Sequence, residues 1–398
     1  MSKLEELIQQ YCPDGVEWKT LAECCNILDG KRKPITKGAR QSGPYPYYGA
    51  NGIQDWVADY IFDGTYVLIG EDGSVITPNG TPIVNWAHGK IWVNNHAHII
   101  AETTGVLLRF LFYYIQIIDI HNLVHGNIPK LTQGDLKEIE IPVPPLPVQE
   151  EIVGILDTFT ELQAELQAEL QKRKQQYNYY LDNLLNFKNI NRGGCQAEVR
   201  WMKMSEVMSI SRGASPRPIQ NYLTDAEDGI PWIKIGDVSP SSKYISSTKE
   251  KIKKEGATKS RYLKKGDFIL SNSMSFGRPY ILNIDGCIHD GWISMYGFEE
   301  HLDQDYLYYV LRSESVQTFW TAKANSGGAV SNLNSDIVRK TLIPIPSMAE
   351  QKRIASILDR FDRLTNDLTS GLPAEIEKRR QQYEYYRDKL LTFKRKGA

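Results

Sequence analysis

Two distant segments of this chain carry nearly the same sequence, and this duplication constrains the fold more than any other feature. Residues 141–159 read IPVPPLPVQEEIVGILDTF, and residues 343–361 read IPIPSMAEQKRIASILDRF. A second matching pair follows, KRKQQYNYYLDNLLNF at 172–187 and KRRQQYEYYRDKLLTF at 378–393. A chain written twice predicts two copies of one structural unit, related by an internal pseudo-twofold repeat.

The repeated blocks predict two long helices. Apolar residues recur every three or four positions among Glu, Gln and Lys, which is typical of an amphipathic helix. The prolines from Pro142 to Pro147 cannot lie in a helix interior, so we expect the first helix over about 148–187, roughly 60 Å long. The second copy, over about 348–394, can cover its apolar stripe in an antiparallel, coiled-coil-like pair. Gly371 and Pro373 predict a break or kink in that copy.

The segments between the repeats differ from each other and predict mixed domains. Short β-rich runs at 66–69, 90–93 and 267–270 alternate with Gly, Asn and Pro turns, and a helix is expected near the end of each segment, at 104–119 and 303–320. We therefore predict an α+β protein in which two mixed α/β domains are separated by two long helices. The expected boundaries are 1–146 for the first domain, 147–190 for its helix, 191–346 for the second domain and 347–398 for its helix.

Charge and hydropathy favour a cytoplasmic protein that meets a polyanion along limited tracks. The formal net charge is −1, but residues 30–50 contain Lys and Arg without Asp or Glu, and residues 243–265 are also rich in Lys and Arg. Such stretches suit phosphate contacts, although solvated loops would look the same. Nothing resembles a membrane span of about 18 apolar residues, and the N-terminus lacks the apolar core of a signal peptide.

The sequence offers no clear catalytic or metal-binding motif. The pairs His96/His98 and His121/His125 have spacings seen at metal sites, but no third ligand of the right kind lies near them, so we expect no metal. A Walker pattern, a nucleotide-binding glycine turn and a methyltransferase Asn/Asp-Pro-Pro-Tyr/Phe element are all absent. We therefore expect no cofactor in this chain, and the absent motifs favour a protein that is not itself an enzyme.

The sequence resembles the specificity subunits of type I restriction-modification enzymes across nearly its whole length. The resemblance rests on the run 45–52 (YPYYGANG), the run 68–74 (LIGEDGS) and the run 93–98 (VNNHAH). It also rests on the pattern Ile-Pro-x-Pro, then Gln, then Ile-x-x-Ile-Leu-Asp, which occurs in both halves. The duplication makes the match specific, because any one of these motifs alone would be weak.

The resemblance implies that each domain is a target-recognition domain that reads one half of a split, asymmetric target in double-stranded DNA. It implies that the helices dock two modification subunits, which carry the S-adenosylmethionine site and methylate adenine. Restriction subunits joining that complex would supply ATP- and Mg-dependent translocation and cleavage.

One stretch of the first helix resembles a length-setting element. Residues 161–170 read ELQAELQAEL, a tetrapeptide repeat that one branch of the family carries in this helix. Four helical residues add roughly 6 Å and a net rotation of about 40°, which is close to the rotation of one base-pair step. Since all four residue types also favour helix, an ordinary helical repeat remains the alternative.

Candidate DNA contacts are polar and cationic side chains in turn-rich stretches, because these can reach groove edges and phosphates. In the first domain they are Lys31, Arg32, Lys33, Arg40, Tyr47, Tyr48, Asn51, Asn94, Asn95 and His96. In the second domain they are Arg212, Arg217, Lys234, Asn272, Ser273, Ser275, Arg278 and His289. The candidates for the spacer and for subunit docking are Gln149, Ile152, Leu156, Phe159, Leu162, Leu166, Leu170, Gln351, Ile354, Leu358 and Phe361.

Two alternative functions stay open from the sequence. A coiled-coil structural adaptor would explain the helices but not the two long β-rich segments. A self-contained DNA-modifying enzyme would need an active site that the motifs do not reveal.

Overall fold

A computed structural model describes residues 3–187, 199–239, 242–272, 276–324, 332–367 and 369–397. The chain divides into two compact units. The first unit comprises Met1–Leu166 and Ile376–Ala398, and the second comprises Gln167–Glu375. In the described parts of the chain, no helix is both long enough and apolar enough to cross a membrane.

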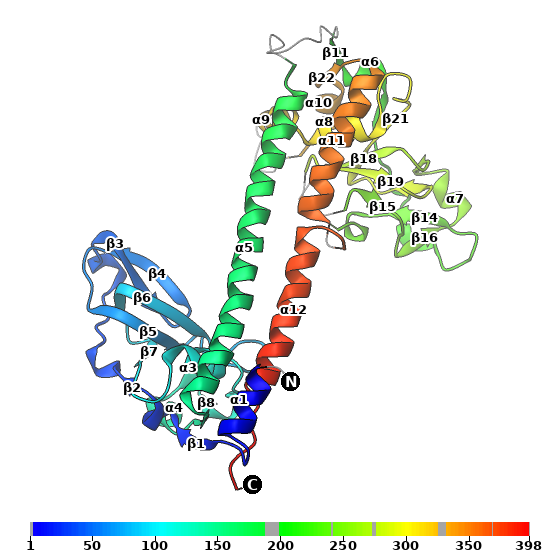
Figure 1. The fold of residues 1–398 in the computed structure, drawn as a ribbon. Coiled ribbons are helices and arrows are strands. Elements are labelled where there is room, and N and C mark those ends of the chain that lie inside the picture. Colours follow the sequence, from blue (N-terminus) through cyan, green and yellow to red (C-terminus); the bar gives the residue numbers. More distant parts are fainter. Residues whose placement is uncertain are drawn as a thin grey trace. The chain divides into compact units, whose positions relative to one another are not determined.

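The first unit is built around one six-stranded sheet, ordered β2-β7-β5-β6-β3-β4. Helix α3 carries six buried side chains and packs on this sheet, between the sheet and α5 in Figure 1. The elements before α5 are α1 (Lys3–Tyr11), β1 (Glu17–Thr20), α2 (Leu21–Cys24), β2 (Asn26–Ile27), β3 (Ser42–Gly49), β4 (Gly52–Val57), β5 (Phe62–Gly70), β6 (Val84–Val93), β7 (Ala97–Ala101), α3 (Leu108–Ile115), β8 (Val124–His125), β9 (Lys130–Leu131), α4 (Gln133–Lys137) and β10 (Glu140–Val143).

The second unit contains two five-stranded sheets, ordered β12-β21-β18-β19-β15 and β13-β16-β14-β20-β17. Strand β18 is buried along its whole length, as expected for a central strand of apolar sequence. The elements are β11 (Arg200–Lys203), α6 (Met204–Val207), β12 (Ser209–Arg212), β13 (Leu223–Thr224), β14 (Ile230–Ile233), β15 (Tyr244–Ile245), β16 (Glu250–Ile252), α7 (Lys254–Ala257), β17 (Arg261–Leu263), β18 (Phe268–Ser271), β19 (Pro279–Leu282), β20 (Gly286–Ile288), β21 (Trp292–Tyr296), α8 (Gln304–Arg312), α9 (Glu314–Ala324), α10 (Ser335–Arg339) and β22 (Leu342–Ile345).

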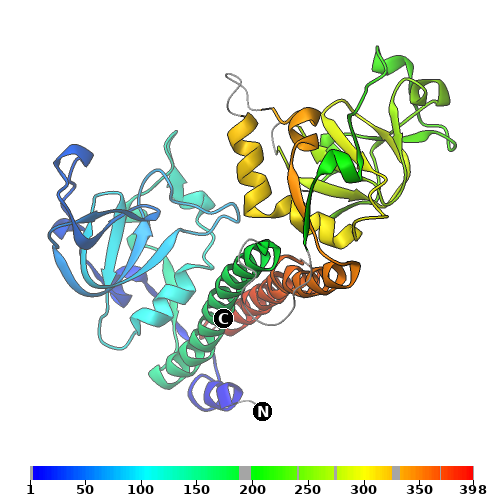
Figure 2. The same ribbon diagram turned by 90° about the horizontal axis from the view of Figure 1, so that it is seen from above.

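The repeated blocks form long helices, as predicted. Helix α5 spans Leu146–Leu185, and the second copy forms α11 (Met348–Asn366) and α12 (Leu372–Leu390). Within the first unit, α5 runs antiparallel beside α12, and Phe159 stacks on Tyr386. Within the second unit, α5 runs antiparallel beside α11, and Tyr180 stacks on Phe361 (Figures 1 and 2). The predicted break is confirmed at Gly371, where an added Cβ would lie 2.4 Å from the Arg363 carbonyl oxygen.

The duplication is visible in matching local structures at the start and end of each domain. Strand β1 pairs antiparallel with β10, and β11 pairs antiparallel with β22. The registers correspond, because Trp18 lies opposite Pro142 as Trp201 lies opposite Pro344. The predicted fold class, two mixed α/β domains joined to a pair of repeated helices, is confirmed. The predicted domain boundaries follow the sequence repeats, whereas the compact units each contain part of α5 and part of α12.

Candidate nucleic-acid interface

In the first unit, polar residues gather where β5 ends and β7 begins. These strands are antiparallel, with Gly70 opposite Ala97, so the residues after β5 lie beside those before β7. The Glu71 amide donates to the His96 carbonyl oxygen over 2.9 Å. His96 also contacts the Asp72 carboxylate through Nδ1. This sheet edge therefore presents side chains from two distant stretches of sequence together.

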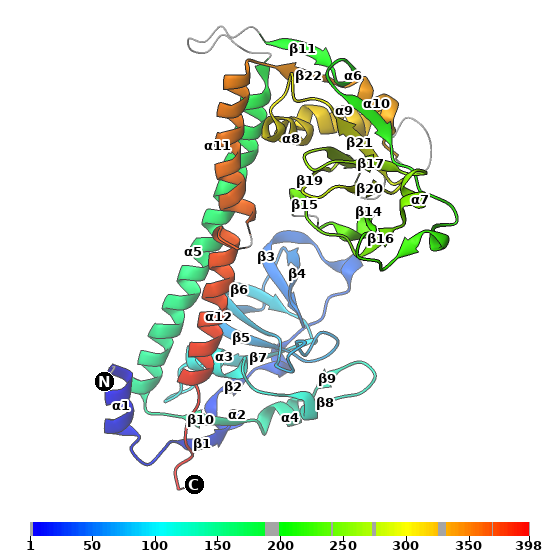
Figure 3. The ribbon, with the colours of Figure 1, turned by 90° about the vertical axis from the view of Figure 1, so that its right-hand side faces the viewer.

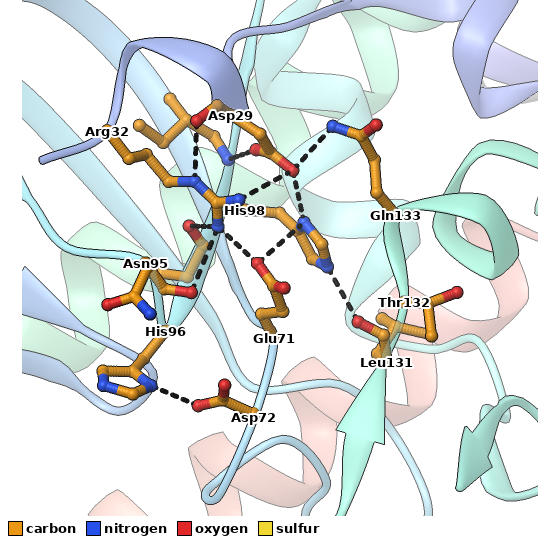
Figure 4. A network of polar contacts seen from close by, with 12 residues as sticks. Asp29, Arg32, Glu71, Asp72, Asn95, His96, His98, Leu131, Thr132 and Gln133 are labelled. Carbon is orange, nitrogen blue, oxygen red and sulfur yellow. Dashed lines mark hydrogen bonds and ion pairs between the residues drawn. The ribbon is translucent and has the colours of Figure 1, made fainter. Parts of the chain in front are cut away.

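A buried ionic network lies directly behind this edge (Figure 4). His98 Nδ1 lies 2.6 Å from Asp29 Oδ2, and His98 Nε2 lies 2.9 Å from the Leu131 carbonyl oxygen. Both ring nitrogens of His98 thus contact an oxygen atom, so neither is left without a partner. The other Asp29 oxygen accepts a hydrogen bond from the Ile99 amide at 2.9 Å. The side chain of His98 is completely buried and that of Asp29 is 3% exposed.

Arg32 connects this buried pair to Glu71. Its Nη1 donates to the Glu71 carboxylate, and to the Ala97 carbonyl oxygen over 2.8 Å. Its Nε donates to the Asp29 carbonyl oxygen over 2.9 Å. Burial raises the pKa of Asp29, but the hydrogen bond and charge of His98, the Ile99 amide and the Arg32 guanidinium outweigh burial and hold the pKa below its usual range. The carboxylate is therefore charged near neutral pH.

Asp29, Glu71 and His98 are also the one group in the described residues that could offer three ligand atoms to a metal, within 4.8 Å of one another. However, both nitrogens of His98 are hydrogen-bonded, and Arg32 holds both carboxylates. A cation would have to displace Arg32 to bind here. The chemistry of the group fits an internal ion network that fixes the sheet edge in place.

In front of the network lies a hollow of about 550 Å³, with both apolar and polar groups in its lining. It contains two predicted DNA contacts, Asn51 and His96. Its other lining residues are Ala50, Gln54, Asp72, Gly73, Ser74, Ile128 and Lys130. The candidates predicted from the sequence did not include Gln54, Asp72 and Lys130, although Asp72 lies within the run 68–74 that carries the resemblance. The hollow can accept a base edge, because it offers amide, carboxylate, imidazole and ammonium groups together.

The structure separates the remaining candidates of the first domain into exposed and buried residues. Lys31, Lys33 and Asn95 are exposed, whereas Arg32 points inward. Tyr47, Tyr48 and Asn94 are buried, at 1%, 9% and 2% exposure, so their side chains pack inside the domain. Arg40 lies 4.1 Å from the Tyr47 ring centre and pairs with Asp55 over 3.1 Å. Asn94 accepts a hydrogen bond from the His96 amide over 2.8 Å and so shapes the turn.

The second unit has the same backbone arrangement at the equivalent sheet edge. The Leu333 amide donates to the Asn272 carbonyl oxygen over 3.0 Å, as the Leu131 amide donates to that of Glu71 over 2.9 Å. The Asn272 amide in turn donates to the Gly291 carbonyl oxygen over 3.1 Å. Strand pairing sets Ser271 opposite Trp292 as it sets Gly70 opposite Ala97. Asn272 therefore occupies the place of Glu71.

The side chains at this second edge differ from those at the first. The pair Ile210 and Met295 corresponds to the pair Ile27 and Ile100 of the first unit. Two residues after the first member of each pair, Arg212 takes the place of Asp29, and two residues before the second member, Ile293 takes the place of His98. The polar group here is centred on Asp290, which accepts from Ser215 Oγ over 2.8 Å.

Basic side chains lie around Asp290 at this edge. Arg217 lies 3.3 Å from the carboxylate, His289 lies 3.0 Å from it, and Arg212 donates to the Asp290 carbonyl oxygen over 3.0 Å. Burial raises the pKa of Asp290, but the Ser215 hydrogen bond and the charges of His289 and Arg212 lower it below its usual range. The Arg217 side chain is 82% exposed, although it pairs with Asp290.

The other predicted contacts of the second domain lie at several places. The Asn272 side chain donates to the Asp290 carbonyl oxygen over 3.1 Å, inside the edge. Lys234 pairs with Glu250 over 2.5 Å, and Arg278 is half-buried. Ser273 and Ser275 lie outside the described residues.

Most of the predicted spacer and docking residues are buried within their own unit. The side chains that are 7% exposed or less are Gln149, Ile152, Leu156, Leu170, Gln351, Ile354 and Leu358. Phe159 and Phe361 are half-buried and stack on Tyr386 and Tyr180, with ring centres 5.6 and 5.1 Å apart. Leu166 is half-buried, and Leu162 is 41% exposed. The apolar stripe thus packs inside the protein, and other residues are left for a partner.

Two domains with one backbone plan and different polar edges, each joined to a copy of one repeated helix, define a two-part nucleic-acid recognition protein. The sequence profile of the type I restriction modification DNA specificity domain matches this chain twice, over residues 13–176 and 196–378. The chain belongs to this family of type I specificity subunits, which recognise DNA by sequence. The match to both halves does not support the adaptor or the self-contained enzyme.

Individual relatives agree with this assignment. A Haemophilus influenzae protein described as a type I restriction enzyme specificity subunit is 38% identical over 402 residues, 98% of each chain. The specificity subunit of the Escherichia coli type I restriction enzyme EcoR124I/EcoR124II is 34% identical over 310 residues, 73% of this chain and 72% of the relative.

Solved structures share the fold. The S subunit of a type I system from M. genitalium has a TM-score of 0.60 at 15% identity, covering 95% of this chain and 96% of that chain. A chain from a study of type I R-M complex assembly and conformational transition has a TM-score of 0.62 at 17% identity, covering 95% and 98%.

Proposed function

We propose that this chain reads two different DNA half-sites, one with each unit, and so directs a type I enzyme to a bipartite, asymmetric target. The observation that supports this most is the shared backbone edge with different exposed side chains, such as Asp72 in one unit and Arg217 in the other. Bases are distinguished by the donors and acceptors that side chains bring to a groove. One backbone plan with two side-chain sets therefore suits two half-sequences.

In the first unit, the hollow supplies groups for base edges, and the exposed cations beside it supply phosphate contacts. A carboxylate such as Asp72 accepts from the cytosine amino group, and the Gln54 amide suits adenine. A carboxylate without a partner would repel DNA of every sequence. Asp72 has a partner, because it contacts His96, and this supports a role for Asp72 in reading a base. Lys31 and Lys33 are exposed and suit phosphates, which position the protein without reading sequence.

The test is methylation of a randomised DNA library by this chain together with its modification subunit. We expect His96→Ala or Asp72→Asn to relax the preference at one or two bases of one half-site, by about 1–3 kcal/mol per lost contact. Arg217→Ala, a change of an exposed side chain in the second unit, is expected to act on the other half-site alone. Glu150→Ala, an exposed helix change, serves as the matched control. A change in the first unit that altered both half-sites would contradict the proposal.

We also propose that two copies of one modification subunit bind equivalent helical patches. Tyr179 and Tyr385 hold the same position in the two repeated blocks, and they are 64% and 62% exposed. Exposed aromatic side chains are enriched at interfaces, and equal patches suit equal partners. Tyr179→Ala and Tyr385→Ala are each expected to reduce the bound modification subunits from two to one, measured by native mass spectrometry. Full assembly of the double variant would contradict this docking.

In this proposal, chemistry belongs to the partners. S-adenosylmethionine binds the modification subunits, which methylate adenine in the cytoplasm. ATP and Mg bind the restriction subunits, which translocate and cleave DNA. The tetrapeptide repeat Glu161–Leu170 lies inside the continuous helix α5, and we propose that it sets the gap between the half-sites.

A further inference from the structure

The glutamine that occurs in both repeated blocks makes the same three hydrogen bonds in each unit. Gln149 Nε2 donates to the carbonyl oxygens of Pro144, over 2.7 Å, and Gly105, over 3.1 Å. Its Oε1 accepts from the Leu107 amide over 2.9 Å. These contacts join the first turn of α5 to the loop that precedes α3.

The second glutamine repeats this arrangement. Gln351 Nε2 donates to the carbonyl oxygens of Pro346, over 3.0 Å, and His301, over 2.9 Å, and its Oε1 accepts from the Asp303 amide over 2.8 Å. Gln149 and Gln351 are 0% and 1% exposed. Because both side chains are buried and fully bonded, they serve internal contacts in both units and are closed to a partner.

The aspartate of both repeated blocks forms a second matching joint. Asp157 Oδ1 accepts from the Tyr113 hydroxyl, and from Arg109 Nε over 2.7 Å. Asp359 Oδ1 accepts from the Tyr309 hydroxyl over 2.5 Å and from Lys243 Nζ over 3.0 Å. Tyr113 belongs to α3, which lies between the sheet of the first unit and α5. Tyr309 belongs to α8, which lies beside α11 in the second unit (Figure 3).

The charge states in these joints favour strong hydrogen bonds. Burial raises the pKa of Tyr113 and of Tyr309, and the hydrogen bond to the aspartate raises each pKa further. Both hydroxyls therefore stay protonated and act as donors. Burial lowers the pKa of Lys243, but Asp305 and Asp359 outweigh burial and raise it. Each aspartate thus receives one hydroxyl donor and one cation, which makes a charge-assisted contact of defined direction.

Glutamine and aspartate lie eight positions apart in each helix, which is about 12 Å along the axis. Between them, Ile152 and Leu156 in one unit, and Ile354 and Leu358 in the other, are completely buried. Apolar packing of this kind is non-directional and would tolerate small sliding or rotation of the domain on its helix. Two hydrogen-bonded points on one helix axis define both position and angle.

We infer that Gln149 with Asp157, and Gln351 with Asp359, are positioning residues that hold each domain at one angle on its helix and so define which gap between half-sites is accepted. This inference rests on the proposed two-half-site function. It assigns the repeated Gln and Asp a role in spacing, whereas base identity is read at the sheet edges.

The test uses Tyr113→Phe and Tyr309→Phe, which each remove one hydroxyl from a joint and keep the ring. Tyr11→Phe, at an exposed tyrosine, is the matched control. Each chain is combined with its modification subunit, and methyl transfer is measured on duplexes with the native gap, one base pair less and one more. A second duplex set carries single base changes in either half-site. Thermal melting of every variant confirms that it is folded.

We expect each variant to lose about tenfold in its preference for the native gap, the size of one lost charge-assisted hydrogen bond. Base preferences should stay unchanged. A variant with a lower melting temperature is judged by the ratio of methylation on the native gap to methylation on the altered gaps, because a loss of folded protein lowers both rates equally. An equal loss of methylation on all gaps would overturn the inference and leave the joints as supports of stability. If the wild-type chain itself showed no dependence on two half-sites, the proposed function would fail instead.

Discussion

Arg32 gives the sharpest test of the structure, because its side chain is mostly buried whereas the side chains of both neighbouring lysines are exposed. Lys31 and Lys33 are exposed, whereas the Arg32 side chain is 13% exposed and holds Glu71, also 13% exposed, and Asp29, 3% exposed. Arg32→Ala leaves two mostly buried carboxylates with one histidine between them. Removing one partner of a buried charge network costs about 3–5 kcal/mol. We expect the first unit to lose stability by this amount.

The assay is urea unfolding, because urea does not screen charges as guanidinium chloride does. Hydrogen exchange on the peptides that contain β5 and β7 then assigns the loss to the first unit. Lys31→Ala is the control and should change the free energy of unfolding by less than about 0.5 kcal/mol.

In DNA binding the expected effects are reversed, because the lysine variants should change the salt dependence and the Arg32 variant should not. Lys31→Ala and Lys33→Ala should each reduce the salt dependence of binding by about one phosphate contact. Arg32→Ala, measured where it is folded, should leave that salt dependence unchanged. A stable Arg32→Ala variant that lost one phosphate contact would refute the assignment of Arg32 to the internal network.

Three further outcomes follow from the same geometry. Deleting the four residues Glu165–Ala168 from α5 should shorten the gap by about one base pair and keep both half-sites, because four helical residues turn a net angle of about 40°. Methylation mapping that shows an unchanged gap would exclude a length-setting role for the repeat. The pKa of Asp29 is lowered in the folded state, so its stabilisation is present above the ordinary value near 3.9 and is lost as the pH falls below it. Urea unfolding at pH 3 to 6 should therefore depend less steeply on pH in Asp29→Asn, and equal slopes would count against the network. Gln351→Ala leaves three buried backbone groups unpaired and should cost at least about 2 kcal/mol in the second unit, against almost none for exposed Glu150→Ala; calorimetry that shows equal losses would contradict the joint.

The long helices could be predicted because their signal is local and occurs twice. A period of three to four residues, the proline run before the first copy and Gly371 in the second all act over short stretches of chain. The predicted ends of α5, 148 and 187, lie within two residues of the observed Leu146 and Leu185. The strand runs at 66–69 and 90–93 were predicted for the same reason and lie within β5 and β6, and the run 267–270 overlaps β18.

The ionic network could not be predicted, because its members lie far apart in sequence. Asp29, Glu71, His98 and Leu131 come from four separate stretches of the chain that only the fold brings together. In the sequence, Arg32 looks like its lysine neighbours, and His98 looks like the second half of a histidine pair. The pairing of Arg32 with two carboxylates decides that it points inward, and no local pattern carries that information.

The joints show a different limit of sequence reasoning. The repeat marked Gln149, Asp157 and their second copies as important, and the resemblance suggested docking for the glutamines. Their hydrogen bonds instead run to the loops and helices of their own domains. Repetition alone cannot separate a residue that binds a partner from one that holds a domain, because both roles recur once per unit.

The central claim is that each unit reads its own half-site. Base-resolved mapping of methylated adenine, in cells that express this chain with its modification subunit, tests it most directly. We predict one bipartite, asymmetric motif with a fixed gap, in which Asp72→Asn changes one half and Arg217→Ala changes the other. A single uninterrupted motif, or one in which both variants change the same half, would contradict it.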